Sequence, residues 1–298
     1  MKKYTFHEFL RKALIYAYCA PLMLDRDEKN KLWRRKYRTS LKRYTLDLSK
    51  VHENKVNSSE EYVFTCWFQG YDQAPAIVKK CIDSIRRCFP NKDVVVITKK
   101  NMGKYIDIPD YILAKWKSGA MGDAHFSDIL RILLLYKFGG WWLDATVMIF
   151  DQVPEFISDT SLFLFKSSFL DDSIPSISSW LIFVKKSQHP FIGGIRDSLL
   201  NYWRANDKNP DYYLFHDFVT VLADTPAYKE YWDGIPYYSN VGPHILQHEL
   251  FQPYKYKRFT QIINVSSIQK LTYKLDGCDI NDKRTNLYHI LNGDSKYG

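Results

Sequence analysis

Two acidic residues and one arginine between residues 128 and 144 are the side chains best suited to chemistry. Asp128 and Arg131 are three positions apart in a segment of helical periodicity, so on a helix they would share one face. Asp144 lies within the apolar run 141–150, where a carboxylate is costly unless it is paired or bound to a cation. In open α/β sheets ligands bind beyond the carboxyl ends of the strands, which makes Asp144 a candidate binding residue. Two simpler alternatives stay open: an ordinary intrahelical ion pair for Asp128 and Arg131, and a turn cap or a paired buried acid for Asp144.

The surrounding sequence predicts the elements that would position these residues. Residues 62–68 and 93–98 are short β-branched or aromatic runs, and the segment between them has helical spacing after Pro75. Strand, helix and strand in this order make a βαβ unit, so the sheet should be partly parallel. A longer helix over 125–138 ends at Gly139-Gly140, and a third strand over 141–150 contains Asp144. We also expect strands at 162–165 and 180–184, and helices at 190–203 and 211–222.

These residues together form a pattern that resembles a known family. Ser127-Asp128 and Arg131, followed by Gly139-Gly140 and then Asp144-Ala145-Thr146, resemble the core motif of glycosyltransferase family 32. The large clostridial glucosylating toxins carry a related pattern with a D-x-D motif. The sequence is most similar to bacterial capsular polysaccharide synthesis proteins, in which a Trp-x-x-Gly motif precedes the same block, here residues 67–70. Further matches make the resemblance span about residues 60–275, and they are found at Ser179-Trp180, 202–203, 211–216, 239–240, 243–244 and 270–274.

The resemblance implies a GT-A fold, an α/β fold with a Rossmann-like mixed sheet flanked by helices. It also implies a nucleoside-diphospho-sugar donor, with a UDP-sugar expected, and retention of the anomeric configuration. By motif, Asp128 and Arg131 would hold ribose and sugar hydroxyls, and Asp144 would be the first acid of D-x-D. Asp128, Arg131 and Asp144 are therefore the candidate catalytic residues. The candidate donor-binding set adds four further residues to these three: Trp67, which would stack on the base, Gln69, Thr146 and Trp180.

A divalent cation is the expected cofactor, and one residue leaves its requirement open. Thr146 stands where the second acid of D-x-D would be, which removes a charge from the usual Mn²⁺ or Mg²⁺ site. Mg²⁺ is often held by one or two carboxylates together with substrate phosphates, so we expect the metal at Asp144. His244 is the candidate second ligand, because several GT-A enzymes supply a late histidine; an ordinary surface or core histidine is the alternative. The order of His244, His248 and Glu249 differs from the H-E-x-x-H zinc motif.

Basic residues are concentrated at the N-terminal end of the chain. The 298 residues carry a formal net charge of +9, and residues 1–60 hold 15 Lys and Arg against 7 Asp and Glu. Five apolar residues recur there at helical spacing: Trp33, Tyr37, Leu41, Tyr44 and Leu48. A basic amphipathic helix is typical of membrane-surface binding, so an anionic membrane surface is an expected partner. The apolar run 13–24 is shorter than the roughly 20 residues of a spanning helix. The alternatives are packing of this helix on its own domain and nucleic-acid binding; without a base-reading module we expect no nucleic-acid partner.

The polar segment 50–60 is the expected boundary between two parts of the chain. We predict a basic helical extension over 1–58 and a GT-A domain over 59–298. Within the domain, 59–155 would be the nucleotide-sugar-binding half and 156–298 the acceptor-side half. Five cysteines without a CxxC pair favour a reduced, cytosolic compartment.

The expected protein is a bacterial, retaining glycosyltransferase at the inner face of the cell membrane, cytoplasmic and peripheral. It would transfer a sugar to a lipid-linked glycan or a surface or capsular polysaccharide. Phosphate-binding P-loop, dinucleotide and nucleophile-elbow motifs are absent from the sequence. Two alternatives come from other classes: a non-catalytic scaffold that binds a nucleotide sugar or glycan, and a nucleic-acid-binding protein that uses the basic N-terminus.

Overall fold

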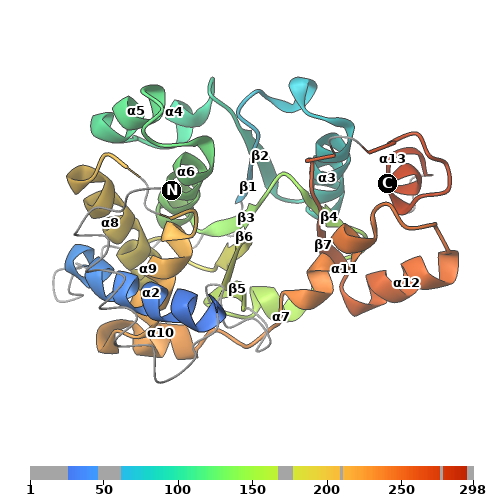
Figure 1. Ribbon diagram of the computed structural model, residues 1–298. Coiled ribbons are helices and arrows are strands. Elements are labelled where there is room, and N and C mark those ends of the chain that lie inside the picture. Colours follow the sequence, from blue (N-terminus) through green and yellow to red (C-terminus); the bar gives the residue numbers. More distant parts are fainter. Residues whose placement is uncertain (1–25, 46–61, 167–176, 209–210, 276–277, 294–298) are drawn as a thin grey trace, which may run out of the picture.

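The structure is a computed structural model in which helices surround a central sheet (Figure 1). It describes residues 26–45, 62–166, 177–208, 211–275 and 278–293. The predicted boundary at 50–60, the apolar run 13–24 and Leu48 lie outside these residues. Within the described part of the chain, no helix combines the length and the apolar character needed to cross a bilayer.

The central sheet has five strands in the order β2-β1-β3-β6-β5. β1 pairs in parallel with β2 on one side and with β3 on the other, whereas β6 is antiparallel to both β3 and β5. The sheet is therefore mixed, as the sequence predicted, and strands before and after residue 156 share it. The strand bounds are β1 (Tyr62–Cys66), β2 (Asp93–Ile97), β3 (Gly140–Leu143), β5 (Leu162–Lys166) and β6 (Ile177–Val184).

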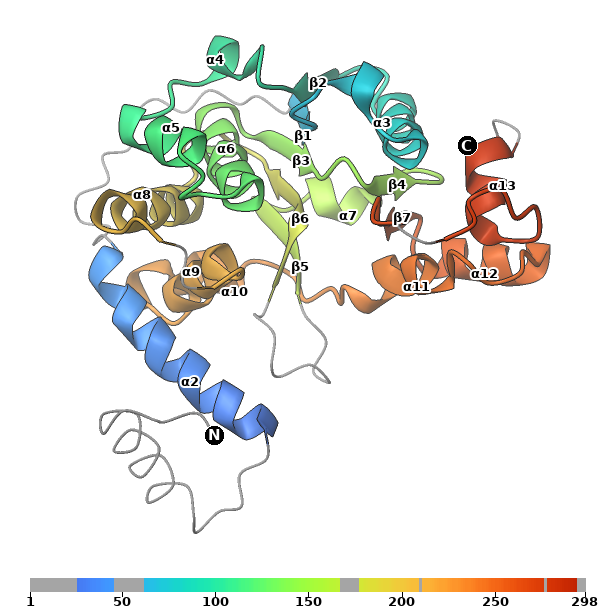
Figure 2. The ribbon, with the colours of Figure 1, turned by 45° about the horizontal axis from the view of Figure 1, so that its top comes forward.

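Helices cover both faces of this sheet (Figure 2). Successive side chains of β3 point to opposite faces of the sheet, so Trp142 lies in the core on one face and Trp141 in the core on the other. The helices that pack on the Trp142 face are α5 (Asp110–Lys117), α6 (Asp123–Phe138), α8 (Pro190–Ala205) and α9 (Leu214–Ala223). The opposite face packs on α3 (Ala76–Cys88) and α7 (Glu155–Ser158). Shorter elements complete this part: α4 (Met102–Tyr105), α10 (Lys229–Asp233) and the 3₁₀ turns η4 (Tyr71–Gln73) and η5 (Pro226–Tyr228).

The single strand predicted over 141–150 is wrong, because the chain leaves the central sheet at Asp144. The Asp144 N–H donates to the Trp180 carbonyl, and the Asp144 carbonyl accepts from Val147 N–H, which closes a turn. The chain then continues as β4 (Val147–Ile149), which pairs antiparallel with β7 (Ile268–Lys270) in a second, two-stranded sheet. A third core joins this sheet to α3 and to α11 (Val241–Glu249), α12 (Tyr256–Val265) and α13 (Asn286–Asn292).

Glycines at the end of α6 allow β3 to enter the sheet. Gly139 and Gly140 have φ of 68° and 78°, in the left-handed region. A Cβ at Gly140 would lie 2.3 Å from the Tyr62 carbonyl oxygen on β1. The pair therefore ends the helix and lets β3 approach β1 closely enough to hydrogen-bond.

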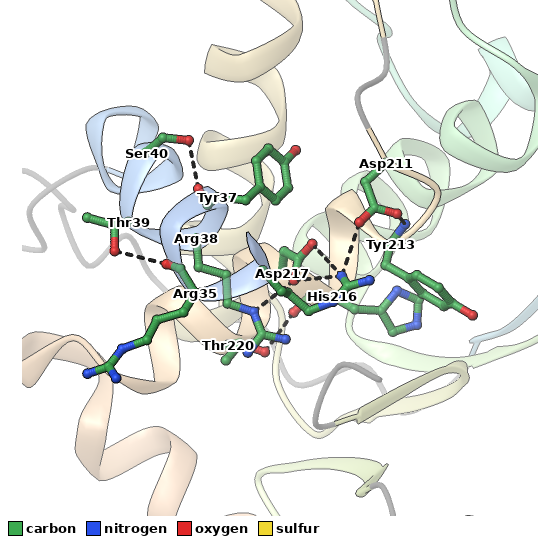
Figure 3. Close-up of polar contacts among 11 residues, drawn as sticks. Arg35, Tyr37, Arg38, Thr39, Ser40, Asp211, Tyr213, His216, Asp217 and Thr220 are labelled. Carbon is green, nitrogen blue, oxygen red and sulfur yellow. Dashed lines mark hydrogen bonds and ion pairs between the residues drawn. The ribbon is translucent and has the colours of Figure 1, made fainter. Parts of the chain in front are cut away.

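The basic amphipathic segment forms α2 (Arg26–Leu41) and the 3₁₀ turn η2 (Lys42–Tyr44), and it packs on its own domain. Leu41 is 1% exposed within the main core, while Trp33 remains 50% exposed. Arg38 Nε donates to Asp217 on α9 at 2.8 Å, as Figure 3 shows, and Arg34 Nη1 donates to the same carboxylate at 3.1 Å. The predicted stripe thus does contact the domain, and two of its flanking arginines are paired there.

Candidate active site

A cavity of about 710 Å³ opens at one edge of the central sheet and contains most of the predicted site residues. β1 and β3 are parallel, so Trp67 and Asp144, which directly follow these strands, emerge at the same edge. Antiparallel β6 begins at this edge and adds Trp180. The rest of the cavity wall comes from α6, from residues 212–216 at the start of α9, from residues 240–247 around α11, and from residues 270–274.

Arg131 is the centre of the polar network in this cavity and is only 4% exposed. Its Nη1 donates to Asp128 Oδ1 at 2.5 Å, and its Nη2 donates to Asp144 Oδ1 at 3.0 Å. Trp142 Nε1 also donates to Asp144 Oδ1, at 2.9 Å, and the Trp142 ring lies 4.9 Å from the guanidinium carbon. Cation–π contact and two carboxylates compensate the burial of the guanidinium. The arginine therefore fixes the positions of both acids.

The two acids respond to this arginine in opposite ways. Burial raises the pKa of Asp128 to about 6, even though the charge of Arg131 opposes the shift. Burial also disfavours ionised Asp144, but Arg131, Lys270 and the Trp142 hydrogen bond together lower the pKa of this carboxyl below its usual value. Asp144 is thus a carboxylate at neutral pH, and Asp128 changes its charge close to neutral pH. Separated pKa values in one cavity are typical of functional sites.

Several polar atoms on the cavity wall are buried without a hydrogen-bond partner in the described residues. They are Trp67 Nε1, Arg131 Nε, Trp180 Nε1 and His216 Nδ1. Buried polar groups are normally paired, and three of these atoms are N–H donors. A ligand with hydrogen-bond acceptors would complete the pairing of these donors once a small movement of the wall exposed them.

Aromatic and imidazole rings provide flat surfaces beside these donors. Trp67 meets Tyr273 edge to face with ring centroids 5.1 Å apart, and Trp180 meets His244 in the same way at 5.7 Å. His244 Nδ1 lies 2.7 Å from the Asn240 carbonyl, so this nitrogen carries a proton and Nε2 is the acceptor of the neutral ring. Burial, supported by the charge of Lys270, lowers the pKa of His244 and keeps it neutral.

The cavity offers no activated side chain for covalent catalysis among the described residues. Burial raises the pKa of the Cys66 thiol to about 12, which keeps it protonated. Burial and the charge of Arg131 lower the pKa of His216 to about 3, so its ring is neutral as well. Both carboxylates are already hydrogen-bonded to Arg131. The site is arranged to bind and to stabilise charge.

The residues around Asp144 do not fit the expected divalent-cation site. Asp144 Oδ1 is occupied by two donors, and Lys270 lies near the other oxygen and donates to the Thr146 hydroxyl. No three His, Cys, Asp or Glu side chains in the described ranges come together as a metal-binding group. A metal at Asp144 and His244 thus remains a prediction, and this donor set does not favour it.

The structure brings together seven of the eight predicted site residues along the cavity wall: Trp67, Asp128, Arg131, Asp144, Thr146, Trp180 and His244. Gln69 is exposed in the turn after β1 and is not part of this wall. Residues 211–216 and 270–274 match the family pattern, but the sequence predicted no role for His216 or Lys270 on the cavity wall. The four described cysteines are free thiols.

The chain is similar to a curated protein and to two solved structures. The curated protein O-glycosyltransferase braB of Annulohypoxylon truncatum is 27% identical over 107 residues, which are 33% of this chain and 25% of that protein. The chain thus spans about a quarter of that relative's length. Among solved structures, PaToxG Glycosyltransferase matches with a TM-score of 0.41 and 15% identity over 71% of this chain and 90% of that chain. A transferase mutant matches with a TM-score of 0.34 and 13% identity over 74% of this chain and 96% of that chain.

The family comparison covers nearly the whole sequence. The sequence model of a protein family described as capsular polysaccharide synthesis protein matches residues 23–290. This range includes α2, the central sheet and the elements that line the cavity. The resemblance inferred from the Ser127-Asp128, Arg131 and Asp144-Ala145-Thr146 pattern is confirmed by this match. The chain belongs to the capsular polysaccharide synthesis protein family.

Proposed function

We propose that this protein transfers a glycosyl group from a nucleoside-diphospho-sugar, with UDP as the nucleotide, to a hydroxyl of a glycan or lipid-linked glycan. The observation that carries the proposal is the hydrogen-bond network of Arg131 beyond the carboxyl ends of parallel strands β1 and β3. A buried guanidinium aligns two carboxylates beside unpartnered indole N–H groups in one cavity. Family membership and the glycosyltransferase relatives support the same class of reaction.

Each part of a nucleotide sugar meets a suitable group in this cavity. The Trp67 ring offers a stacking surface for a base, an interaction worth about 1–3 kcal/mol per base. Asp128 and Asp144 can accept hydrogen bonds from ribose and sugar hydroxyls. Among the described residues on the wall, the basic side chains are Arg131, Lys270 and Lys274, which offer positive charge to a diphosphate.

Retention of configuration is proposed to proceed by attack from the side on which the diphosphate leaves. This route needs no covalent enzyme intermediate, and the protonated Cys66 and arginine-bound carboxylates supply no free nucleophile. The acceptor oxygen forms its bond to the anomeric carbon as the bond to the phosphate oxygen breaks. The phosphate oxygen takes the electron pair, and the hydroxyl proton passes to the departing diphosphate.

A location at an anionic membrane surface, on the cytoplasmic side, completes the proposal. Arg35, Lys36, Lys42 and Arg43 are exposed on α2 and η2, whereas the neighbouring Arg34 and Arg38 are paired with Asp217. Each basic residue near an anionic leaflet contributes about 1 kcal/mol. A lipid-linked acceptor would be found at such a surface.

Release of UDP from a panel of UDP-sugars, with candidate acceptors supplied, tests the proposed reaction. Asp144→Asn keeps the shape of the side chain and removes its charge, so turnover should fall by about 10²–10³-fold, as for loss of other electrostatic groups in active sites. Asp107→Asn, at an exposed position away from the cavity, is the matched control and should retain full activity. Donor binding without turnover would instead support a non-catalytic scaffold, and no donor binding at all would refute the proposal.

A further inference from the structure

Lys270 is a basic residue of the cavity wall that contacts the Asp144–Thr146 turn. It ends β7 opposite Val147 of β4, in the strand pair that follows this turn. Its Nζ donates to Thr146 Oγ1 and lies 3.7 Å from Asp144 Oδ2. The side chain is 19% exposed and forms part of the cavity wall. The ammonium group therefore stands between the two side chains that would flank a metal in a D-x-D motif.

The threonine at the position of the second acid of D-x-D explains why an ammonium group can stand where a divalent cation would be expected. An aspartate at 146 would place another negative charge beside Asp144 and create a demand for a divalent cation. Thr146 supplies a neutral acceptor in its place, and one ammonium then suffices to partner both the Thr146 hydroxyl and the carboxylate. The Thr146 contact uses one of the three N–H donors of the lysine. Donors are thus left for a ligand in the cavity.

The charges on the described wall of the cavity point the same way. Three basic residues face two acidic ones, and both acids already accept from Arg131. The two basic residues other than Arg131 are Lys270, which ends β7, and the exposed Lys274, four residues further along the chain. An anionic group that entered this side of the cavity would meet an ammonium before it met a free carboxylate.

We propose that the Lys270 ammonium takes the place of the divalent cation and neutralises the diphosphate as it leaves, which makes the transferase metal-independent. This inference rests on the proposed glycosyl transfer. The bond from the anomeric carbon to the phosphate oxygen breaks with its electron pair on that oxygen, and Lys270 stabilises the new charge while keeping its own proton. The acceptor proton leaves with the diphosphate, so no metal, oxidant or further reactant is needed.

Metal-depleted full-length protein tests this role by UDP titration calorimetry and UDP-sugar turnover, each in EDTA and in Mn²⁺. Wild type should bind UDP and turn over equally well in both conditions. Lys270→Met keeps most of the side-chain stem and removes the charge; it should weaken UDP binding at least about tenfold and lower turnover about 10²–10³-fold. Lys270→Arg should recover part of both, and Lys257→Met, at an exposed position on α12, is the control for loss of a lysine. Circular dichroism reports whether each variant is folded.

The outcomes separate this inference from the proposed function. Turnover that EDTA abolishes and Mn²⁺ restores would overturn the role of Lys270 and leave the transferase intact. Unchanged UDP binding and turnover in Lys270→Met would also overturn it. A wild-type protein that neither binds UDP nor turns over any donor, with or without Mn²⁺, would remove the transferase itself and the inference with it.

Discussion

Two clusters of arginine and aspartate side chains differ in what surrounds them. In the cavity cluster, Arg131 holds Asp128 and Asp144 beside an opening of about 710 Å³. In the second cluster, which we call the α2–α9 clamp, Arg38 holds Asp217 (Figure 3), and Arg34 contacts both Asp217 and Asp211 at 3.1 Å. Both clusters are built from arginine–carboxylate pairs. They differ in whether polar atoms of the cluster and its surroundings are left without a hydrogen-bond partner.

The carboxylate of the clamp is fully buried between its arginines, whereas the cavity cluster lines an opening and includes polar atoms without a partner. The side chain of Asp217 is fully buried and accepts from two arginines of one helix. Arg131 retains an unpartnered Nε, and the indole N–H groups of Trp180 and Trp67, on the same cavity wall, have no partner in the described residues. Buried ion pairs add little net stability, yet a buried charge that loses its partners is strongly destabilising. The clamp should therefore govern stability and the cavity cluster activity.

Breaking the clamp should have the largest effect on folding. Replacing Arg34 and Arg38 together with Met leaves the Asp217 carboxylate buried without these arginines, at a cost of about 3–5 kcal/mol in the free energy of unfolding. Urea unfolding followed by circular dichroism measures this loss. Turnover per folded molecule should stay near the wild-type value, because neither arginine is part of the cavity wall.

A third substitution shows whether the charge of Asp217 causes that loss. Burial raises the pKa of Asp217 despite the two arginines, so the fold tolerates a neutral side chain here better than an unpaired carboxylate. Asp217→Asn in the double variant should therefore restore much of the lost stability. A triple variant as unstable as the double variant would show that helix packing, and not the ion pair, holds α2 in place.

How far the sequence could predict these clusters depends on the distance over which each contact forms. The helix that carries Asp128 and Arg131, and the Gly139-Gly140 end of that helix, depend on local spacing and were predicted. The amphipathic stripe of α2 was also visible. Its acidic partner was not, because Asp217 lies 179 residues from Arg38 and no local pattern connects them.

The site shows the same limit at Asp144 and Lys270. The apolar run 141–150 is typical of one strand, but its break depends on the Trp180 carbonyl, which belongs to a strand formed later in the chain. Lys270 reaches Thr146 over a separation of 124 residues. Residues 270–274 match the family pattern by sequence, yet the position of the Lys270 ammonium beside the turn depends on the pairing of β4 with β7.

The affinity for the donor should change about tenfold with pH through the cavity cluster, whereas the clamp should not affect this pH dependence. The pKa of Asp128 is raised to about 6, so the carboxylate that accepts donor hydroxyls prevails above pH 6 and is lost below it. Affinity for a UDP-sugar, measured by calorimetry, should fall by about tenfold between pH 7 and pH 5. A UDP-sugar is the suitable ligand, since its diphosphate is esterified at both ends and does not titrate in this range.

Three variants assign that pH dependence. Asp128→Asn should bind with an affinity that is nearly constant over the same range, while Asp217→Asn should keep the wild-type slope. His244→Gln should also keep it, because burial lowers the pKa of this histidine and leaves it neutral. The assignment to Asp128 is wrong if the slope persists in Asp128→Asn or disappears in His244→Gln.

The smallest expected effect distinguishes the exposed basic residues of α2 from those in the clamp. Arg35 and Lys36 are exposed, so neutralising both with Gln should weaken binding to anionic phospholipid vesicles by about fivefold per charge and leave the unfolding free energy unchanged. Lys255→Gln with Lys257→Gln removes the same charge from the segment at α12, at the other end of the molecule (Figure 1), and is the control. Vesicle co-sedimentation at two salt concentrations measures the difference, which should shrink at high salt because exposed charges are screened. Equal binding of the two double variants would mean that the exposed charges of α2 do not contribute to membrane binding, and that α2 serves the fold through its core packing and its paired arginines.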